Sequence, residues 1–313
     1  MLDKLEFSKL YYKKSMSSSD DVFTTLNSYE NEPESFCLAF QNHLSSFLGC
    51  RVRLEKANRG RLGRTFRCVL GSGKVLFCKT HQQGERYRQI LKKEYYFFTN
   101  ANPSVVASYG VFTHDGYDYA YMLQEWLDKS TIIKPEDALE LIDSYNQRLL
   151  VGTDSQPYIG YSFCDLINVS KEELVFLENS TELSHPFCEF LKENITNLEQ
   201  NLPVYEKMIC HGDFGDNNIM RLEGGSFIVI DWEDAFVGIK GYDFLYWLTF
   251  FGHRKFYSSN IFKQSGLSCC DARGLLTVIM IIKTALTVYS GLNKNNSISS
   301  EERIAEMLSY CNY

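Results

Sequence analysis

Two short apolar runs that end in polar residues constrain the fold of this chain more than any other feature. The first run leads into His-Gly-Asp at positions 211–213, and Asn218 follows five residues after the Asp. A Gly-Gly turn precedes the second run, which ends at Asp231, thirteen residues beyond Asn218. The pattern predicts two short strands that carry polar groups at their ends.

Three side chains of this pattern have the chemistry that phosphoryl transfer requires. A loop aspartate, here Asp213, accepts or orients the proton of an attacking hydroxyl group. The amide oxygen of Asn218 and the carboxylate of Asp231 are oxygen ligands of the kind that hold Mg²⁺ on nucleotide phosphates. We therefore predict Asp213 as the catalytic residue, and Asn218 and Asp231 as metal ligands.

The same segment resembles the aminoglycoside phosphotransferase and choline kinase superfamily. It has His211-Gly212-Asp213 where protein kinases have His-Arg-Asp, followed by Asn218-Ile219-Met220 and Ile230-Asp231-Trp232-Glu233. Gly241-Tyr242-Asp243 is similar to the helix start that carries a structural aspartate in this superfamily. The resemblance implies an α+β, bilobal protein-kinase-like fold. It consists of a small lobe with a five-stranded antiparallel sheet and one main helix, and a larger, mainly helical lobe.

Three parts of the chain are expected. Residues 1–35 are rich in Ser, Asp, Asn and Tyr, which predicts a loosely ordered N-terminal extension. Residues 36–126 are expected to form the nucleotide-binding lobe. Residues 127–313 are expected to form the helical lobe with the catalytic loop and the acceptor site.

Apolar spacing predicts the elements of both lobes. The strands of the first lobe are expected at residues 52–57, 65–70, 75–80, 108–113 and 117–126. Its helices are expected at residues 36–49 and 83–100. The helices of the second lobe are expected at residues 135–150, 171–178, 185–200, 242–251, 271–289 and 300–310.

The connection after the first strand is the candidate phosphate-covering loop. It contains Gly60 and Gly63, and glycine allows a backbone to approach phosphate oxygens closely. Two glycines are equally ordinary in a hairpin turn, so the loop alone does not discriminate between the two interpretations.

Lys79 ends an apolar strand segment, as does the lysine that binds the α and β phosphates in kinases. A lysine in such surroundings is costly without a partner, and Glu94 on the next helix is the predicted partner. Glu85 is the alternative. Glu94 could also be an exposed residue that pairs with lysines of its own helix.

The last strand of the small lobe leads into Gln124, Glu125 and Trp126. By its resemblance to the superfamily, this segment is expected to bind the adenine edge through backbone groups. A buried edge strand is the simpler interpretation of the same residues.

Charge and cysteine content limit the function classes. The net charge of −7 argues against broad binding to nucleic acid, although Arg59, Arg61, Arg64 and Arg67 would suit an adaptor of that kind. Ten scattered cysteines without any Cys-x-x-Cys pair indicate reduced thiols and a cytoplasmic location. The N-terminus lacks an apolar signal sequence, and Lys283 interrupts the most apolar region, so no membrane span is expected.

The resemblance implies Mg²⁺-dependent transfer of the γ-phosphoryl group of ATP or GTP to a hydroxyl of a small molecule. A sugar, an amino alcohol or an aminoglycoside would be such an acceptor. The alternative is a catalytically silent, kinase-like nucleotide-binding scaffold. Asp216 and the aromatic segment 152–170 are candidates for contact with the acceptor, although a capping aspartate and a packed insertion explain them equally well. The oligomeric state is not predicted.

Overall fold

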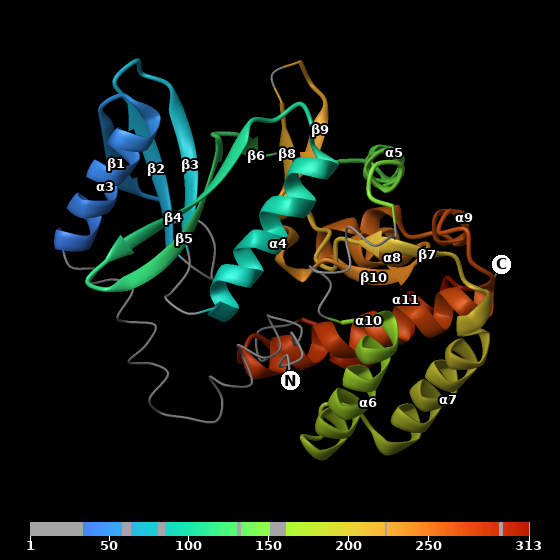
Figure 1. Cartoon of the computed structure of the whole chain (residues 1–313). Helices are drawn as coiled ribbons and strands as arrows, with labels where there is room; N and C mark the ends of the chain where they lie inside the picture. The colour runs from blue at the N-terminus through green and yellow to red at the C-terminus, as the bar shows by residue number, and fades with distance from the viewer. Residues whose placement is uncertain are drawn as a thin grey trace. The chain divides into compact units, whose positions relative to one another are not determined.

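The computed structural model describes residues 34–57, 64–80, 85–129, 133–150, 161–222, 224–293 and 297–312 (Figure 1). The chain forms two compact units. The first, called the small lobe, contains the described residues up to 129 and the later segment Ile219–Glu233. The second, called the large lobe, contains those from 133 to Asn218 and from Asp234 onward. The fold is α+β with two lobes, as predicted.

A five-stranded antiparallel sheet forms the centre of the small lobe. Its strands are β1 (Val52–Lys56), β2 (Arg64–Leu70), β3 (Val75–Thr80), β4 (Ala107–His114) and β5 (Tyr117–Glu125). The order across the sheet is β1-β2-β3-β5-β4. The hairpin of β4 and β5 therefore joins the first three strands through β5, where Lys79 of β3 lies opposite Met122.

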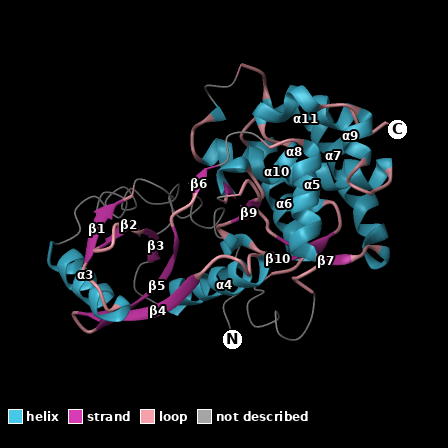
Figure 2. Ribbon diagram, turned by 90° about the horizontal axis from the view of Figure 1, so that it is seen from above, coloured by secondary structure: helices cyan, strands magenta, loops and turns pink. Residues whose placement is uncertain are grey.

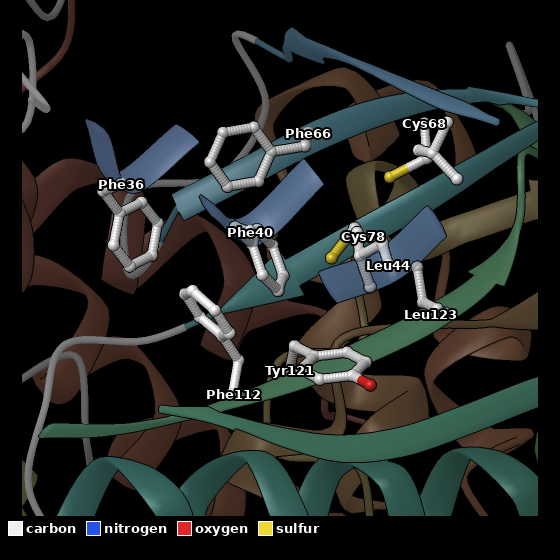
Figure 3. Packing of buried hydrophobic residues seen from close by; sticks show 10 residues of the cluster. Phe36, Phe40, Leu44, Phe66, Cys68, Cys78, Phe112, Tyr121 and Leu123 are labelled. Atoms are coloured by element: carbon white, nitrogen blue, oxygen red, sulfur yellow. The ribbon is translucent and has the colours of Figure 1, made fainter. Parts of the chain in front are cut away.

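One face of this sheet is covered by α3 (Glu34–Leu48), which carries the buried residues Phe36, Phe40 and Leu44. Their spacing of four residues places the three side chains on one side of the helix. They pack against the buried side chains of the sheet (Figure 3): Phe66, Cys68, Cys78, Phe112, Tyr121 and Leu123. Burial of one such large apolar side chain contributes about 1.5–3 kcal/mol.

Alternation along β3 decides where Lys79 lies. Cys78 belongs to the cluster under α3, and successive side chains of a strand point to opposite faces. Lys79 therefore projects from the other face of the sheet. That face is covered by α4 (Glu85–Ala101), which packs on β4 and β5 and buries Phe97 and Phe98.

The later segment of the small lobe is a hairpin of β8 (Ile219–Arg221) and β9 (Phe227–Val229). Strand β8 also pairs with β6 (Asp128–Lys129), which follows the end of the sheet. The side-chain amide of Asn102 donates to the carbonyl of Val229 over 2.9 Å. These contacts explain why the segment groups with the small lobe, whereas the sequence pattern assigned it to the helical lobe. The two-residue strand β6 is too short to be predicted.

Seven helices of the large lobe are described, and α6 and α7 both pack on α10 (Figure 2). The helices are α5 (Pro135–Asn146), α6 (Phe163–Asn179), α7 (His185–Asn201), α8 (Tyr242–Leu248), α9 (Ser259–Lys263), α10 (Cys269–Tyr289) and α11 (Ser300–Ser309). Six of them correspond to predicted helices. The five-residue helix α9 was not predicted.

Helix α6 begins eight residues earlier than predicted. Ser162 caps its N-terminus, because the Ser162 hydroxyl accepts from the backbone N–H of Asp165 and the Asp165 carboxylate accepts from the backbone N–H of Ser162. Phe163 and Asp165, expected in an irregular segment, therefore lie in the first turn of the helix. Residues 152–160 of that segment, with Asp154 and Tyr158, lie outside the described residues.

The first predicted apolar run forms β7 (Lys207–Cys210), which pairs antiparallel with β10 (Phe236–Ile239). Strand β10 was not predicted, since it is short and contains Gly238. A Cβ atom at Gly238 would lie only 2.5 Å from the sulfur of Cys210. Glycine at this position therefore lets the two strands pair, and β7 leads directly into residues 211–218.

Helix α10 is the core helix of the large lobe and packs against α6, α7, α8 and α11. By length and composition it is apolar enough to cross a membrane, and 67% of that stretch is buried within the structure. Packing inside the lobe accounts for its hydropathy. Gly274 allows a close approach to α7, because a Cβ there would lie 2.8 Å from the carbonyl oxygen of Asn194.

Candidate active site

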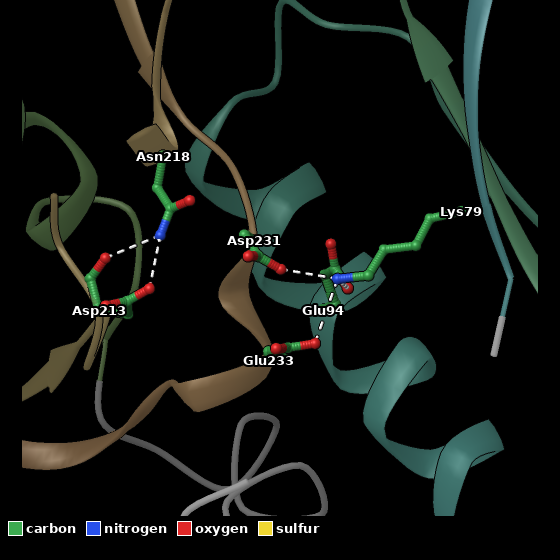
Figure 4. Close-up of polar contacts among 6 residues, drawn as sticks. All are labelled: Lys79, Glu94, Asp213, Asn218, Asp231 and Glu233. Atoms are coloured by element: carbon green, nitrogen blue, oxygen red, sulfur yellow. Dashed lines mark hydrogen bonds and ion pairs between the residues drawn. The ribbon is translucent and has the colours of Figure 1, made fainter. Parts of the chain in front are cut away.

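Four residues of the small lobe form what we call the lysine cluster: Lys79, Glu94, Asp231 and Glu233 (Figure 4). The Lys79 ammonium donates to Glu94 over 2.8 Å, to Asp231 over 2.6 Å and to Glu233 over 3.1 Å. The predicted contact of Lys79 with Glu94 is thus present. The alternative partner, Glu85, contacts Gln89 and Arg88 on the surface of α4.

The neighbouring carboxylates determine the protonation state of the buried Lys79. Burial works against its charged form, but the carboxylates of Asp231, Glu233 and Glu94 outweigh burial and raise the pKa of Lys79 well above its usual value. One ammonium facing three carboxylates leaves an excess of negative charge. Oxygens of the three carboxylates lie within 4.8 Å of one another. The lysine cluster therefore offers carboxylate oxygens, which are the ligands that a hard divalent cation such as Mg²⁺ prefers.

The backbone turn that carries Asp231 is held firmly. Asp231 has φ of +67°, a left-handed conformation that is uncommon for a residue with a side chain and that concentrates at functional sites. The next residue, Trp232, is fully buried, stacks near Phe97 with ring centres 6.1 Å apart, and donates its indole N–H to the carbonyl of Val229 over 2.9 Å. These contacts fix the position of Asp231 next to Lys79.

In the large lobe, residues 211–218 form the loop that carries the predicted catalytic residue Asp213, and we call it the catalytic loop. Asp243 at the start of α8 holds its first residues. The Asp243 carboxylate accepts from the backbone N–H of His211 over 2.8 Å and of Gly212 over 3.2 Å. It also accepts from the Tyr145 hydroxyl over 2.6 Å. Asp243 therefore has the structural role that the sequence resemblance implies.

Asp213 is half-buried, and each of its carboxylate oxygens has a donor. The Tyr246 hydroxyl donates to Oδ1 over 2.7 Å, and the Asn218 side-chain amide donates to Oδ2 over 2.9 Å (Figure 4). Its backbone N–H donates to Nδ1 of the buried His211 over 3.2 Å, so the His211 ring helps to hold Asp213 in place. Because the Asn218 nitrogen faces Asp213, its Oδ1 is turned away and has the chemistry of a metal ligand.

Asp216 anchors the far end of the catalytic loop. Its carboxylate accepts from the indole N–H of Trp247 over 3.0 Å and from Nε2 of His253 over 2.9 Å. Nδ1 of the same ring lies 2.6 Å from the carbonyl oxygen of Trp247. Of the two interpretations of Asp216, this geometry favours the structural one.

Three contacts of the candidate site escaped sequence reasoning. Tyr246 lies one helical turn beyond Asp243, which places both on one side of α8, but a tyrosine in an apolar helix is otherwise typical of a core. Glu233 stood in the recognised motif without any local sign that it would face Lys79. Nothing in the sequence around His253 indicated that its side chain would contact Asp216.

The predicted nucleotide-binding segment lies at the end of β5. Gln124 is buried, and Glu125 forms an ion pair with Lys74 over 3.0 Å. The N–H of Trp126 donates to the carbonyl of Val75 over 3.4 Å. Backbone groups of alternate residues point to opposite sides of an antiparallel strand, so those of Glu125 point to the β4 side, beyond the start of β4. Gly60 and Gly63 lie outside the described residues.

The part of segment 152–170 that is described packs into the large lobe. Tyr161 stacks on Phe236 with ring centres 5.1 Å apart and donates its hydroxyl to the carbonyl of Asp234 over 2.6 Å. Phe163 is buried. Packing therefore explains this part of the segment.

A lysine held by carboxylates in an α+β small lobe, and a fixed aspartate with an asparagine in a helical lobe, define the class of kinase-like phosphotransferases. The chain belongs to the phosphotransferase enzyme family, whose model matches residues 53–258. The family membership confirms the resemblance seen in the sequence. No curated protein matches the chain.

Solved structures share the fold at low sequence identity. A thermostable mutant of aminoglycoside phosphotransferase APH(4)-Ia, in a ternary complex with AMP-PNP and hygromycin B, is 16% identical with a TM-score of 0.58 and covers 87% of this chain and 98% of that chain. The GDP complex of aminoglycoside 2'-phosphotransferase-IIIa is 13% identical with a TM-score of 0.55, over 88% and 97%. Spectinomycin phosphotransferase APH(9)-Ia with ADP and spectinomycin is 11% identical with a TM-score of 0.54, over 86% and 97%.

Proposed function

We propose that this protein transfers the γ-phosphoryl group of ATP or GTP to a hydroxyl group of a small molecule, with Mg²⁺ as cofactor. The observation that carries the proposal is the geometry of Asp213, a half-buried carboxylate whose two oxygens are held by Tyr246 and Asn218. The complexes of similar structures with AMP-PNP, ADP and GDP support a nucleotide as donor. Their complexes with hygromycin B and spectinomycin support a hydroxylated small-molecule acceptor.

Different residues of the chain have different roles in binding the nucleotide and the metal. Lys79 binds the nucleotide phosphates, and the backbone of Glu125 is directed so that it can bind the edge of the base. Asp231, Glu233 and Oδ1 of Asn218 offer oxygen ligands to Mg²⁺, which when bound neutralises charge on the phosphates. Gly60 and Gly63 are proposed to approach the phosphates.

Asp213 orients the acceptor hydroxyl and accepts its proton. The hydroxyl oxygen forms a bond to the γ phosphorus, and the bond from that phosphorus to the bridging oxygen of the nucleoside diphosphate breaks. The products are a phosphate monoester and the nucleoside diphosphate. Positioning and charge neutralisation supply most of the rate enhancement in reactions of this kind.

A cytoplasmic location is part of the proposal. All ten cysteines are free thiols in the structure, which supports a reducing compartment. The acidic net charge of −7 supports a small-molecule partner rather than nucleic acid. No specific observation favours the silent scaffold.

The test is consumption of ATP and GTP with Mg²⁺ across aminoglycosides, amino alcohols and sugars. We expect one acceptor class to support turnover, and Asp213→Asn to abolish it while nucleotide binding is retained. Asp115→Asn is the matched control, because Asp115 lies in an exposed turn with φ of +51°, which asparagine tolerates. Turnover that survives in Asp213→Asn would overturn the assignment. Nucleotide binding without turnover on any acceptor would support the scaffold.

A further inference from the structure

His253 is a buried histidine that the proposed mechanism does not use. It lies in η5 (Phe251–Phe256), the short 3₁₀ helix that follows α8, and it is 4% exposed. Its ring packs on that of Trp247, with ring centres 3.9 Å apart and an angle of 32° between the planes. Both ring nitrogens have partners, so the side chain is held in one orientation.

The two partners of the His253 ring are oxygen atoms. Nδ1 lies 2.6 Å from the carbonyl oxygen of Trp247, which can only accept, so Nδ1 carries a hydrogen. This contact directs Nε2 at Oδ2 of Asp216, 2.9 Å away. The indole N–H of Trp247 donates to the other carboxylate oxygen over 3.0 Å. His253 and Trp247 therefore hold both oxygens of Asp216, and we call these three residues the Asp216 clamp.

The Asp216 clamp lies at the start of the turn that carries Asn218. Asp216 is the first residue of this turn, η3 (Asp216–Asn218). The backbone N–H of Asn218 donates to the carbonyl of Gly215 over 2.8 Å, which closes the turn. Only one residue separates Asp216 from Asn218, so a displacement of the first moves the second.

The orientation of Asn218 matters for two parts of the candidate site. Its side-chain amide donates to the backbone carbonyl and to Oδ2 of Asp213, each over 2.9 Å. These two bonds hold the Asp213 carboxylate and turn Oδ1 of Asn218 away from it, as a ligand for Mg²⁺. A rotation of η3 would alter both.

The turn that carries His253 also contacts the residue before Asp216. The carbonyl of Phe250 accepts from the backbone N–H of His253 over 2.9 Å, and the Phe250 ring packs on Gly215, where a Cβ atom would lie 2.4 Å from it. Core packing explains this second contact. It does not require a hydrogen bond from a buried histidine to the carboxylate of Asp216, whose side chain is 36% exposed.

We infer that His253 is a positioning residue for the proposed phosphoryl transfer. Through Asp216 it holds η3, and η3 orients Asn218 for its contacts with Asp213 and Mg²⁺. This role rests on the proposed function, because it concerns the metal ligand and the carboxylate of that reaction.

Two polar replacements separate the contacts of His253. In His253→Gln, the side-chain amide nitrogen takes the place of Nε2 and donates to Asp216. In His253→Asn, the shorter amide takes the place of Nδ1 and donates to the carbonyl of Trp247, but it does not reach Asp216. We expect kcat to fall about tenfold in His253→Asn with an unchanged acceptor KM, and His253→Gln to keep at least about half of the wild-type kcat.

His43→Asn is the matched control. His43 lies on α3 in the small lobe, with Nε2 3.0 Å from the Tyr121 hydroxyl. The same replacement there should lower Tm without changing kcat. Thermal unfolding confirms that each variant is folded. If His253→Asn does not fold, Asp216→Ala carries the test, since it removes the carboxylate of the Asp216 clamp and leaves the buried ring in place.

Two measurements do not depend on turnover. Hydrogen exchange of the ligand-free protein should be at least about tenfold faster at residues 216–218 in His253→Asn, with exchange of α10 unchanged. Titration calorimetry with AMP-PNP over a Mg²⁺ series should show a rise of about tenfold in the Mg²⁺ concentration for half-maximal binding. A role in stability alone would speed exchange throughout the large lobe and leave the Mg²⁺ series unchanged.

A double-mutant cycle tests whether His253 acts through Asp216. Asp216→Ala should lower kcat at least as much as His253→Asn does. The double variant should have the kcat of Asp216→Ala alone. Effects that multiply in the double variant would show that His253 acts by another route and would overturn the inference.

Three further results overturn it: a wild-type kcat in His253→Asn, an equal loss in His253→Gln, or exchange that quickens equally throughout the lobe. Failure of the proposed function is a different result. Wild type then phosphorylates no acceptor, while loop exchange and the Mg²⁺ series still decide the role of His253. Transfer by wild type, with unchanged loop exchange in His253→Asn, overturns the positioning role alone.

Discussion

Tyr246 and Asp213 are joined by a hydrogen bond of 2.7 Å between the phenol of helix α8 and the carboxylate of the catalytic loop. One turn earlier on the same helix, Asp243 holds the backbone of His211 and Gly212. Helix α8 thus fixes both the beginning of the loop and the carboxylate that is proposed to act on the acceptor. The helix is only seven residues long, and every one of its residues is buried.

Removal of the Tyr246 hydroxyl tests this arrangement. In Tyr246→Phe, Asp213 keeps the donor from Asn218 but loses the donor to its other oxygen. A hydrogen bond to a charged group contributes about 1.5–3 kcal/mol, and a loss of about 1.4 kcal/mol in transition-state stabilisation lowers a rate tenfold. We therefore expect kcat to fall about tenfold with an unchanged nucleotide Kd, as measured by steady-state kinetics and calorimetry.

Tyr257→Phe is the control for this change. Tyr257 is part-buried and donates its hydroxyl to the carbonyl of Leu248 over 2.9 Å, away from Asp213. Tyr257→Phe should lower the free energy of unfolding about as much as Tyr246→Phe does, but without the tenfold loss of kcat. Equal kinetics for Tyr246→Phe and wild type would contradict a positioning role for Tyr246.

Glu233 is expected to contribute to Mg²⁺ binding. Glu233→Gln keeps the size of the side chain and an oxygen that can accept from Lys79, but it removes one of the three negative charges of the lysine cluster. Unit charges about 4 Å apart near a protein surface interact by roughly 4 kcal/mol. Loss of about 1.4 kcal/mol of this energy suffices for a tenfold change, so we expect the Mg²⁺ concentration for half-maximal activity to rise at least about tenfold. Initial rates over a Mg²⁺ series measure it.

Glu85→Gln on the same helix as Glu94 is the matched control for the Mg²⁺ series. Glu85 contacts Arg88 and Gln89 at the surface. Its variant should leave the Mg²⁺ dependence unchanged. If Glu233→Gln also follows the wild-type curve, the lysine cluster does not contribute that carboxylate to the metal.

Gly212 should not tolerate a side chain. Its φ is +83°, and a Cβ atom would lie 2.3 Å from the carbonyl oxygen of Asp234. Gly212→Ala therefore combines the left-handed conformation, which costs alanine about 1–2 kcal/mol, with a clash against backbone. We expect the fall in Tm to be at least twice that of Gly266→Ala, measured by calorimetry. Gly266 has φ of +76°, and its nearest neighbouring atom lies 3.8 Å away, so comparable falls would refute the clash.

Asp243 should make stability depend on pH in the acidic range. Burial raises the pKa of its carboxyl above the ordinary 3.8, and the hydrogen bonds from Tyr145 and the catalytic-loop backbone oppose that rise only in part. Between these two pKa values the folded state binds more protons than the unfolded state. The contribution of the Asp243 carboxyl to the free energy of unfolding is therefore complete below about pH 3.8. It decreases as pH rises through the pKa of this carboxyl in the folded state.

Urea unfolding of wild type and Asp243→Asn from about pH 4 to 8 measures this effect. Asparagine does not titrate, and its amide would face backbone donors, so the variant should be less stable throughout. The difference in free energy of unfolding between wild type and variant should shrink as pH rises. Parallel stability curves would show that Asp243 does not titrate in this range.

Sequence reasoning could locate those parts of the fold and the site that have local signatures. Five strands and the partner of Lys79 followed from apolar runs and from the cost of burying an unpaired ammonium. The start of α6 could also have been found, because Ser162 and Asp165 have the spacing of a capping box. Proposed roles for Gln124, Glu125 and Trp126 stay predictions.

Contacts that depend on tertiary structure could not be predicted. Tyr246 meets Asp213 only because α8 returns to the catalytic loop, and nothing around Tyr246 in the sequence distinguishes it from a core aromatic. The grouping of β8 and β9 with the small lobe depends on β6, whose two residues have no period to detect. Lys283 was noted as an interruption in an apolar stretch, whereas its aromatic neighbours Tyr246 and Phe250 come from α8 and the turn after it.

The central position of α10 has a consequence for synthesis of the chain. Helices α6 and α7 leave the ribosome long before α10, the helix on which both of them pack. Until its 21 residues appear, the apolar sides of the earlier helices have no native partner and are exposed to aggregation. A chain that stops short of residue 269 would therefore contain the complete catalytic loop and yet be a substrate for chaperones and proteases.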